Sequence, residues 1–255
     1  MHNIFTVLNE GYILFGKLLI SSIFDKIDLD KIGSIIIGDA GLSEESIKYF
    51  NTFPKVEIMD TRIKAEESKK IHDLNWKKIV YSKAELLLKA IENYDKFIPT
   101  VMIDADSVII EDFLPLLEGD FDAAACLRNK VGRNPGHTAT STHIGSFFLA
   151  NTEKSIPFIK EWVREIPKII TLSGGQRLPQ ESFALSNIFK KYKNKIQIRN
   201  IDERIISNIE ERPPDFAKIY HLKSDWLYLT IEKRILQPRV SFFVNRYLNL
   251  KKKIN

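Results

Sequence analysis

Short apolar runs alternate with segments of helical periodicity along roughly the first half of the chain. The apolar runs predict buried strands at residues 4–8, 32–37, 56–59, 101–103 and 121–127. The periodic segments predict helices at residues 12–24, 43–53 and 83–93. Strands that alternate with helices favour an α/β sandwich with a mostly parallel central sheet.

The second half of the chain continues with shorter elements. The pattern predicts a strand at residues 144–150, helices at 157–166 and 180–191, and strands at 196–198 and 217–220. Residues 129–143 are rich in Gly, Asn, Thr, Ser and His and have no periodicity, so they predict a loop. Loops of this length in compact domains are often functional. Ser43, which two glutamates follow, is the predicted N-cap of the second helix.

Three predicted turns follow three of the predicted strands. In open α/β sheets, ligands bind beyond the carboxyl ends of the strands. The turns at residues 9–12, 38–41 and 104–106 stand at such ends. Together they predict one binding cleft.

An Asp-Ala-Asp triplet gives this cleft its clearest chemistry. Asp104 and Asp106 flank Ala105 directly after the apolar strand 101–103. Side chains at positions i and i+2 of a strand point to the same face, so we expect two neighbouring carboxylates. Such carboxylates repel each other unless a cation lies between them, and oxygen ligands suit Mg²⁺ or Mn²⁺. A cation there also binds a diphosphate and neutralises it as a sugar–phosphate bond breaks.

The triplet alone leaves other interpretations open. It fits a strand end with two solvated aspartates. It also fits a phosphatase of the haloacid-dehalogenase type with Asp104 as nucleophile, although that motif normally stands on the first strand. A nucleotidyltransferase lacks support, because no glycine-rich amino-terminal loop with a basic residue is present. The sequence contains no P-loop, His-Glu-x-x-His motif, cysteine zinc pattern or dinucleotide fingerprint.

Five segments, in order along the chain, resemble the GT-A glycosyltransferases, especially the family-8-like sugar transferases of bacteria. They are residues 5–12, 81–87, 102–108, 144–151 and 220–226, with 180–185 as a weaker sixth. The resemblance implies the Rossmann-like GT-A fold. It also implies an enzyme that moves a sugar from a nucleotide-diphosphate donor, expected to be UDP-linked, to a saccharide or lipid-linked acceptor. Retention of configuration through an oxocarbenium-like transition state belongs to the same expectation.

The resemblance assigns the nucleotide base to the first strand and its turn. Thr6, Val7 and Asn9 are expected to hold the base, and Tyr12 matches an aromatic residue that stacks on it. The family often carries aspartates in this turn, where this chain has Asn9 and Glu10. The match therefore leaves the identity of the base open.

On the metal side, the resemblance implies that Asp104 and Asp106 bind Mn²⁺ or Mg²⁺ and that His221 is the third ligand. Ala105 is expected to lie against the nucleotide, and Lys223 to pair with the diphosphate. The glycine and second lysine that follow the histidine in the family are absent here. Because several family positions are substituted, a degenerate, non-catalytic nucleotide-sugar-binding domain is an alternative.

On the sugar side, Lys83 matches a basic residue that faces the donor, and Gly145 a glycine beside the sugar. Gln180 and Glu181 resemble an acidic pair near the donor sugar. A neutral amide binds a hydroxyl but cannot act as a base, so Glu181 is the better candidate for acid/base or charge-stabilising chemistry. Alternatively, this carboxylate only stabilises its helix N-terminus. Asp39 either contacts the ribose or caps its turn.

Charge separates the end of the chain from the rest. Residues 232–255 hold seven basic residues and one acidic residue, a charge of +6, so residues 1–231 carry −1 of the total +5. We predict a transferase domain at residues 1–231 and a basic, aromatic tail at 232–255. The tail has the composition of a peripheral anchor at an anionic membrane, or of a helix that packs on the domain. No nucleic-acid partner is expected, because positive charge is not spread over the body of the chain.

Length and cysteine content fit a cytoplasmic domain. A chain of 255 residues can bury enough surface to fold without disulfides or structural metals. The single cysteine, Cys126, lies in an apolar run that predicts a small buried hydrophobe. No signal segment opens the sequence, and the apolar stretch at residues 13–24 is too short to span a bilayer. We expect a cytoplasmic location, peripheral at the inner face of the membrane if the tail is an anchor.

Overall fold

The computed structural model describes most of the chain. The described residues are 1–63, 74–94, 98–128, 142–172, 180–208 and 217–222 of the 255. The basic tail, Lys223 and residues 129–141 of the predicted loop lie outside these ranges.

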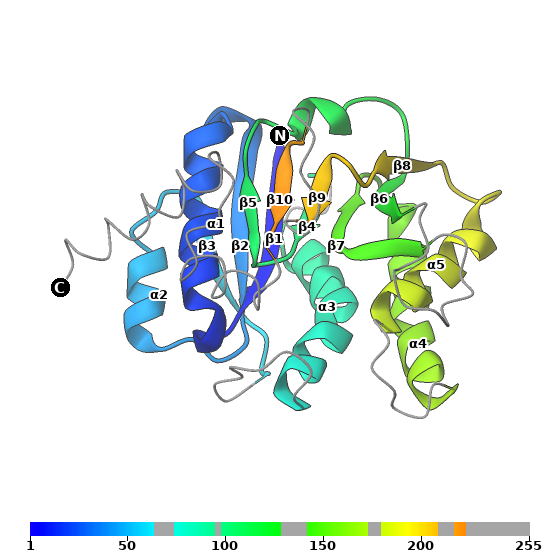
Figure 1. The fold of residues 1–255 in the computed structure, drawn as a ribbon, viewed down its shortest axis with the longest axis horizontal. Coiled ribbons are helices and arrows are strands. Elements are labelled where there is room, and N and C mark those ends of the chain that lie inside the picture. Colours follow the sequence, from blue (N-terminus) through cyan, green and yellow to red (C-terminus); the bar gives the residue numbers. More distant parts are fainter. Residues whose placement is uncertain (64–73, 95–97, 129–141, 173–179, 209–216, 223–255) are drawn as a thin grey trace.

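The central sheet has seven strands within the described residues, in the order β3-β2-β1-β4-β7-β6-β8. Strand β7 runs antiparallel to both of its neighbours, and the other pairs are parallel. The strands are β1 (His2–Leu8), β2 (Ile32–Asp39), β3 (Val56–Asp60), β4 (Thr100–Ile103), β6 (Ala123–Arg128), β7 (Thr142–Ala150) and β8 (Ile198–Asp202). The predicted sandwich with a mostly parallel sheet is therefore confirmed (Figure 1).

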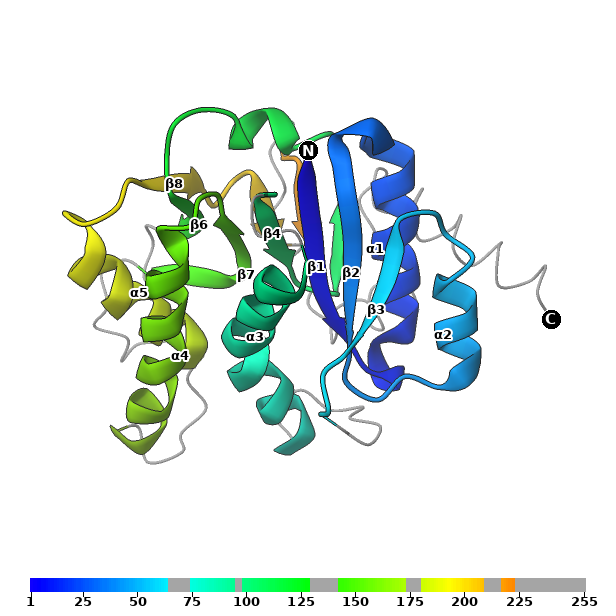
Figure 2. The same ribbon diagram turned by 180° about the vertical axis from the view of Figure 1, so that it is seen from behind.

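Helices cover both faces of this sheet, as the two opposite views in Figures 1 and 2 show. They are α1 (Ile13–Lys26), α2 (Glu44–Phe50), α3 (Leu74–Asn93), α4 (Ser155–Leu172) and α5 (Gln180–Tyr192). Apolar side chains of α1 and α2, such as Leu19 and Phe50, form one core layer with Ile4 of β1. Side chains of α3, α4 and α5 form a second layer with Phe5, the next residue of the same strand. The alternation of side chains along β1 thus separates the two layers.

A small second sheet lies over the β1–β4 region in Figure 1. Its strands are β5 (Ser107–Ile109), β9 (Ile206–Asn208) and β10 (Ile219–His221), in the order β5-β10-β9. The backbone N–H of Ile109 donates to Ser22 Oγ of α1 at 2.9 Å, which fixes β5 on that helix. The short 3₁₀ segments are η1 (Glu10–Tyr12), η2 (Leu29–Lys31) and η3 (Leu114–Leu117).

Several predicted boundaries need correction. Helix α3 begins at Leu74, nine residues before the predicted start, so Lys83 lies in the middle of a helix. Strand β7 begins at Thr142, inside the predicted loop. Strands β5 and β9 were not predicted, because three residues carry too little periodicity to be recognised. Each of these elements depends on pairing or packing with a distant segment, which local pattern does not reveal.

Other predictions are confirmed in detail. Ser43 caps α2 by accepting a hydrogen bond from the backbone N–H of Ser46 at 3.1 Å. Cys126 is fully buried in β6. Among the described helices, none combines the length and apolar character needed to cross a bilayer.

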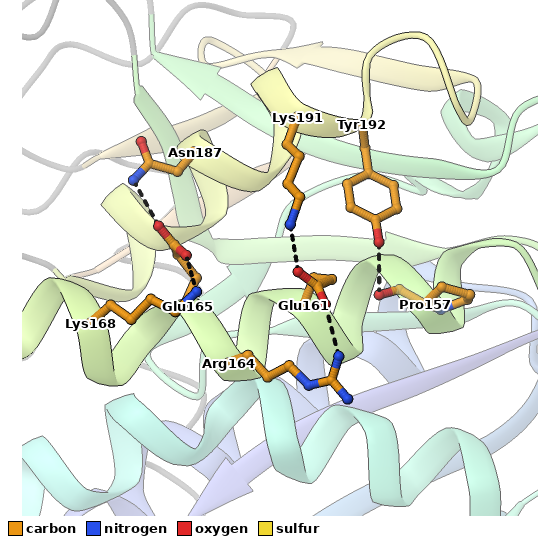
Figure 3. Close-up of polar contacts among 8 residues, drawn as sticks. All are labelled: Pro157, Glu161, Arg164, Glu165, Lys168, Asn187, Lys191 and Tyr192. Carbon is orange, nitrogen blue, oxygen red and sulfur yellow. Dashed lines mark hydrogen bonds and ion pairs between the residues drawn. The ribbon is translucent and has the colours of Figure 1, made fainter.

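Polar contacts at the surface join helix α5 to helix α4 (Figure 3). Lys191 Nζ lies 2.7 Å from Glu161 Oε2, and Asn187 Nδ2 donates to Glu165 Oε1 at 3.2 Å. Hydrogen bonds from Lys191 and Arg164, together with their charges, lower the pKa of Glu161 to about 2. The two helices are therefore linked on their outer side as well as through the core.

Candidate functional site

Three turns meet at the carboxyl edge of the central sheet, as the sequence predicts. Strands β2, β1 and β4 are adjacent and parallel, so their carboxyl ends lie at the same edge. The backbone N–H of Glu10 donates to Gly41 O at 3.0 Å, which joins the turn after β1 to the turn after β2. The Asp-Ala-Asp triplet follows β4 at this edge.

The two aspartates converge through a turn and not through strand alternation. Strand β4 ends at Ile103, and residues 104–106 turn back before β5 begins. The N–H of Ser107 donates to Asp104 O at 3.2 Å, which closes this turn. The N–H of Asp104 donates to Ser146 O of β7 at 3.0 Å, which fixes the turn to the sheet. The predicted pair is real, but the predicted reason for it was wrong.

His221 joins the aspartates from a segment more than 100 residues later. Strand β10 pairs antiparallel with β5 so that His221 stands opposite Ser107, the residue after the triplet. Its Nε2 lies 3.0 Å from Asp106 Oδ1 and 3.5 Å from Asp104 Oδ2. One ligand atom from each of these three residues lies within 4.8 Å of the others.

This donor set fits a divalent cation. Two carboxylates and one imidazole are ligands that Mn²⁺ and related metals accept. Burial alone would raise the pKa of Asp106, but His221 and Lys83 outweigh burial and lower it, so the carboxylate is ionised. Burial would lower the pKa of His221, but Asp106 and Asp104 outweigh burial and raise it. The two aspartates thus favour a positive charge at this position. A proton on His221 can supply that charge, and a bound metal ion can supply it instead.

Lys83 extends the charged group toward α5. Its Nζ lies 2.6 Å from Asp104 Oδ1 and 4.0 Å from Glu181 Oε1. Burial alone would lower the pKa of Lys83, but the carboxylates of Asp104, Glu181 and Asp106 outweigh it and raise the pKa above its ordinary value. Lys83 is therefore a permanent cation at the floor of the site, and not a helix N-terminal lysine in solvent.

Glu181 lies in the first turn of α5 and is 8% exposed. Trp162 Nε1 of α4 donates to its backbone carbonyl at 3.0 Å, which fixes the start of α5. Burial raises the pKa of Glu181, Asp104 raises it further, and Lys83 only partly opposes them. Its Oε2 has no hydrogen-bond partner among the described residues. Gln180 is the first residue of α5 beside it.

The turn after β1 contains further polar atoms without partners. Thr6 Oγ1 and both amide atoms of Asn9 are buried and unpaired within the described part of the chain. Val7 is half-buried against the α3 side of the sheet. Tyr12 is half-buried, and its ring centroid lies 5.6 Å from that of Phe15. The four residues predicted to hold the nucleotide base therefore lie along one strand end and its turn.

The side chain of Asp39 is engaged in its own turn. Its Oδ1 accepts from the N–H groups of Gly41 and Leu42 at 2.8 and 2.7 Å, so it caps the turn. Gly145 lies in β7, between the strand's start and the Ser146 carbonyl that holds Asp104. The contact of either residue with a ligand stays a prediction.

Sequence reasoning missed two serines at the same edge. Ser107 and Ser146 are buried, and each hydroxyl lacks a partner among the residues that the structure describes. A serine in a strand gives no signal in the sequence pattern. Their importance becomes visible only when the turn, β7 and β10 are brought together.

Solved structures of glycosyltransferases share this fold at low sequence identity. An active-site mutant of LgtC aligns with a TM-score of 0.64 and 13% identity over 98% of this chain and 95% of LgtC. A second LgtC structure, of the galactosyltransferase in complex with donor and acceptor sugar analogs, gives 0.59 and 12% over the same shares. The bifunctional glycosyltransferase WbbM gives 0.56 and 13% over 87% of this chain, which spans only 45% of WbbM. At such identities the likeness establishes the fold alone.

A family model adds information from the sequence itself. The model described as nucleotide-diphospho-sugar transferase matches residues 45–233, which is more than half of the chain. This range includes Lys83, the aspartate pair, Glu181 and His221. No curated protein sequence matches the chain significantly.

Proposed function

Because this chain belongs to the nucleotide-diphospho-sugar transferase family, we propose that it is a Mn²⁺- or Mg²⁺-dependent glycosyltransferase. It moves a sugar from a UDP-linked donor to a saccharide or lipid-linked acceptor. The observation that carries the proposal is the convergence of Asp104, Asp106 and His221 at the carboxyl edge of the sheet. Open α/β sheets bind their ligands at this edge.

The residues of the proposed site fall into two groups, one that binds the nucleotide diphosphate and one that acts on the sugar. Asp104, Asp106 and His221 would hold the cation, which, when bound, neutralises the diphosphate leaving group. Lys83 holds Asp104 in place through a 2.6 Å contact and adds a positive charge beside the diphosphate. In the same proposal Lys223 pairs with the diphosphate, and Ala105 and Asp39 contact the nucleotide.

Glu181 acts on the sugar side. Its carboxylate lies 4.0 Å from Lys83 and keeps one oxygen without a partner in the described part of the chain. We assign it the stabilisation of the positive charge that develops on the sugar ring in an oxocarbenium-like transition state. Gln180 and Gly145 would contact sugar hydroxyls and the sugar face, respectively. Because a carboxyl oxygen without a hydrogen-bond partner is costly to bury, Oε2 is better explained by this role than by helix capping alone.

Two observations support the proposed acceptor. LgtC has been solved with donor and acceptor sugar analogs, and this chain has the LgtC fold, which supports a saccharide acceptor. The basic tail at residues 232–255 is the basis for a lipid-linked acceptor at an anionic membrane surface. Co-sedimentation with phosphatidylglycerol vesicles should fall when residues 233–255 are deleted, whereas donor hydrolysis should persist. Unchanged co-sedimentation would remove the membrane from the proposal.

Isothermal titration with UDP, with and without Mn²⁺, tests the central claim. We expect binding that strengthens with Mn²⁺, followed by nucleotide release from one donor in a screen of sugar nucleotides. Mn²⁺-dependent binding without turnover of any donor would favour the degenerate, non-catalytic domain. Phosphate release from an aryl phosphate would favour the phosphatase. Absence of nucleotide binding in the presence of Mn²⁺ would refute both the transferase and the degenerate-domain interpretations.

A further inference from the structure

Asn9 is an unusual residue for the end of a central strand. It is 1% exposed and directly follows β1 at the carboxyl edge of the sheet. Neither Oδ1 nor Nδ2 has a hydrogen-bond partner among the described residues. An unpaired buried polar group is costly, so an amide with two such atoms requires an explanation. A ligand that supplies one donor and one acceptor would satisfy both atoms.

The backbone of this turn is held rigidly around Asn9. The N–H of Tyr12 donates to Asn9 O at 3.0 Å, and the N–H of Glu10 donates to Gly41 O at 3.0 Å. These two bonds fix the turn on both sides. The side chain of Asn9 therefore starts from a defined position.

The neighbouring acid is committed elsewhere. Glu10 Oε2 accepts from the N–H of Ser43 at 2.9 Å, and Glu10 Oε1 accepts from Ser46 Oγ at 3.1 Å. Both oxygens thus bind the N-terminal turn of α2. Asp39 Oδ1, in the next turn, binds its own backbone. The amide of Asn9 is consequently the group of these turns that has both polar atoms available.

An amide binds a nucleobase differently from a carboxylate. A carboxylate only accepts, whereas an amide has one acceptor oxygen and one donor nitrogen. Uracil presents N3–H beside the O4 acceptor, which match Oδ1 and Nδ2. Cytosine presents the acceptor N3 beside the N4 amino donor, which match the same amide after a half-turn about its terminal bond. An ionised carboxylate can satisfy N3–H of uracil but meets the lone pair of N3 in cytosine.

We propose that Asn9 binds the pairing edge of a pyrimidine and that the site accepts cytidine as well as uridine diphosphates. The inference rests on the proposed function, because it concerns the base of the same nucleotide donor. It goes further by replacing a uridine-selective site with one that tolerates both pyrimidines. A good two-bond contact to a base discriminates by roughly 5- to 150-fold, so losing the match should be measurable.

The test measures the dissociation constants of UDP and CDP with Mn²⁺ for the full chain. For the wild type we expect the two values to agree within about tenfold. In Asn9→Asp, measured at pH 8 to keep the new carboxylate ionised, CDP should weaken relative to UDP by about tenfold or more. In Asn9→Ala both nucleotides should weaken together. The circular dichroism spectrum confirms that each variant is folded.

Glu10→Gln is the matched control. It changes the adjacent residue from an acid to an amide and should leave the UDP-to-CDP ratio unchanged while it lowers the melting temperature. A wild-type preference for UDP above about a hundredfold, an unchanged ratio in Asn9→Asp, or tighter binding of GDP or ADP than of either pyrimidine would overturn the inference. If no nucleoside diphosphate binds the wild type with Mn²⁺, the proposed function itself fails.

Discussion

Both the amino edge and the carboxyl edge of the central sheet contain buried carboxylates, but the partners of these carboxylates differ between the two edges. At the amino edge, Asp122 stands directly before β6 and is 5% exposed. Its Oδ1 accepts from Thr152 Oγ1 at 2.7 Å, and its Oδ2 accepts from the N–H of Gln197 at 2.9 Å. At the carboxyl edge, Glu181 Oε2 has no partner in the described residues, and two further carboxylates share a lysine and a histidine.

The pKa directions express the same contrast. Burial would raise the pKa of Asp122, but hydrogen bonds from Thr152 and the Gln197 backbone, with a smaller contribution from Lys154, outweigh it and lower the pKa. At Glu181 burial is the largest influence, and the pKa is raised. Neutral donors of the protein thus complete the charge at the amino edge. At the carboxyl edge the aspartates are paired with charged groups of the protein, and Glu181 keeps one oxygen without a hydrogen-bond partner among the described residues, as expected where a protein gives up stability for function.

The substitution Asp106→Asn removes a proposed metal ligand at the carboxyl edge and should have the largest effect on nucleotide release. Removing one anionic ligand weakens cation binding, so metal-dependent nucleotide release should fall by at least about 100-fold, or roughly 3 kcal/mol of transition-state stabilisation. The fold should survive, because asparagine has the same shape as aspartate and its amide oxygen can still accept a hydrogen bond from His221. Nucleotide release and thermal unfolding measure the two effects.

The exposed Asp120→Asn supplies the control for this variant and should change neither quantity. Near-normal turnover in Asp106→Asn would refute the metal site. A loss of folding in Asp106→Asn would instead mean that this edge, like the other, is built for stability.

The substitution Asp122→Asn removes a carboxylate at the amino edge. It should lower stability and leave nucleotide release unchanged. The amide keeps one acceptor oxygen, so it loses either the hydrogen bond from the Gln197 N–H or the one that the Thr152 hydroxyl donates. We expect the free energy of unfolding to fall by about 1–3 kcal/mol, which corresponds to roughly 2–4 °C in melting temperature per kcal/mol. Nucleotide release at a temperature below the transition should stay normal. Asp120→Asn again serves as the control, and equal stability of the two variants would contradict this role of Asp122.

The pH dependence of stability sharpens the role of Asp122. Because its pKa is lower in the folded than in the unfolded protein, the unfolded chain binds more protons between the two values. The contribution is therefore fully present above the ordinary aspartate pKa of about 3.9 and is lost as pH falls through the folded value. Urea midpoints of wild type and Asp122→Asn should differ most above about pH 4 and converge at lower pH. A difference that does not change with pH would contradict the argument.

Lys154→Ala should have the smallest effect. Its Nζ lies 3.7 Å from Asp122 Oδ1, but its side chain is 73% exposed. Water screens such a pair, so unfolding free energy should change by no more than about 1 kcal/mol. A loss as large as that in Asp122→Asn would show that charge, and not neutral hydrogen bonding, holds this edge. Chemical unfolding of the two variants in the same buffer makes the comparison.

Local pattern in the sequence determined much of the framework. Apolar runs located β1, β2 and β4, because a buried strand needs a largely apolar segment whatever its neighbours are. Ser43 identified the start of α2, because a capping hydroxyl acts on the backbone of its own turn. Asp104 and Asp106 were found for a similar reason, since two acids after a buried strand are an unusual local arrangement.

Tertiary structure alone decided how these acids are used. The sequence suggested His221 only through a family resemblance, and the β5–β10 pairing brings its ring to Asp106 across 115 positions. It placed Lys83 at a helix start, whereas the longer α3 buries it between Asp104 and Glu181. Pairing partners and burial depend on segments that are distant in the chain, and charge state depends on burial and partners together. The sequence by itself therefore determined the main strands of the central sheet, the Ser43 cap and the presence of the aspartate pair, and only the fold decided which charged partners each buried acid has.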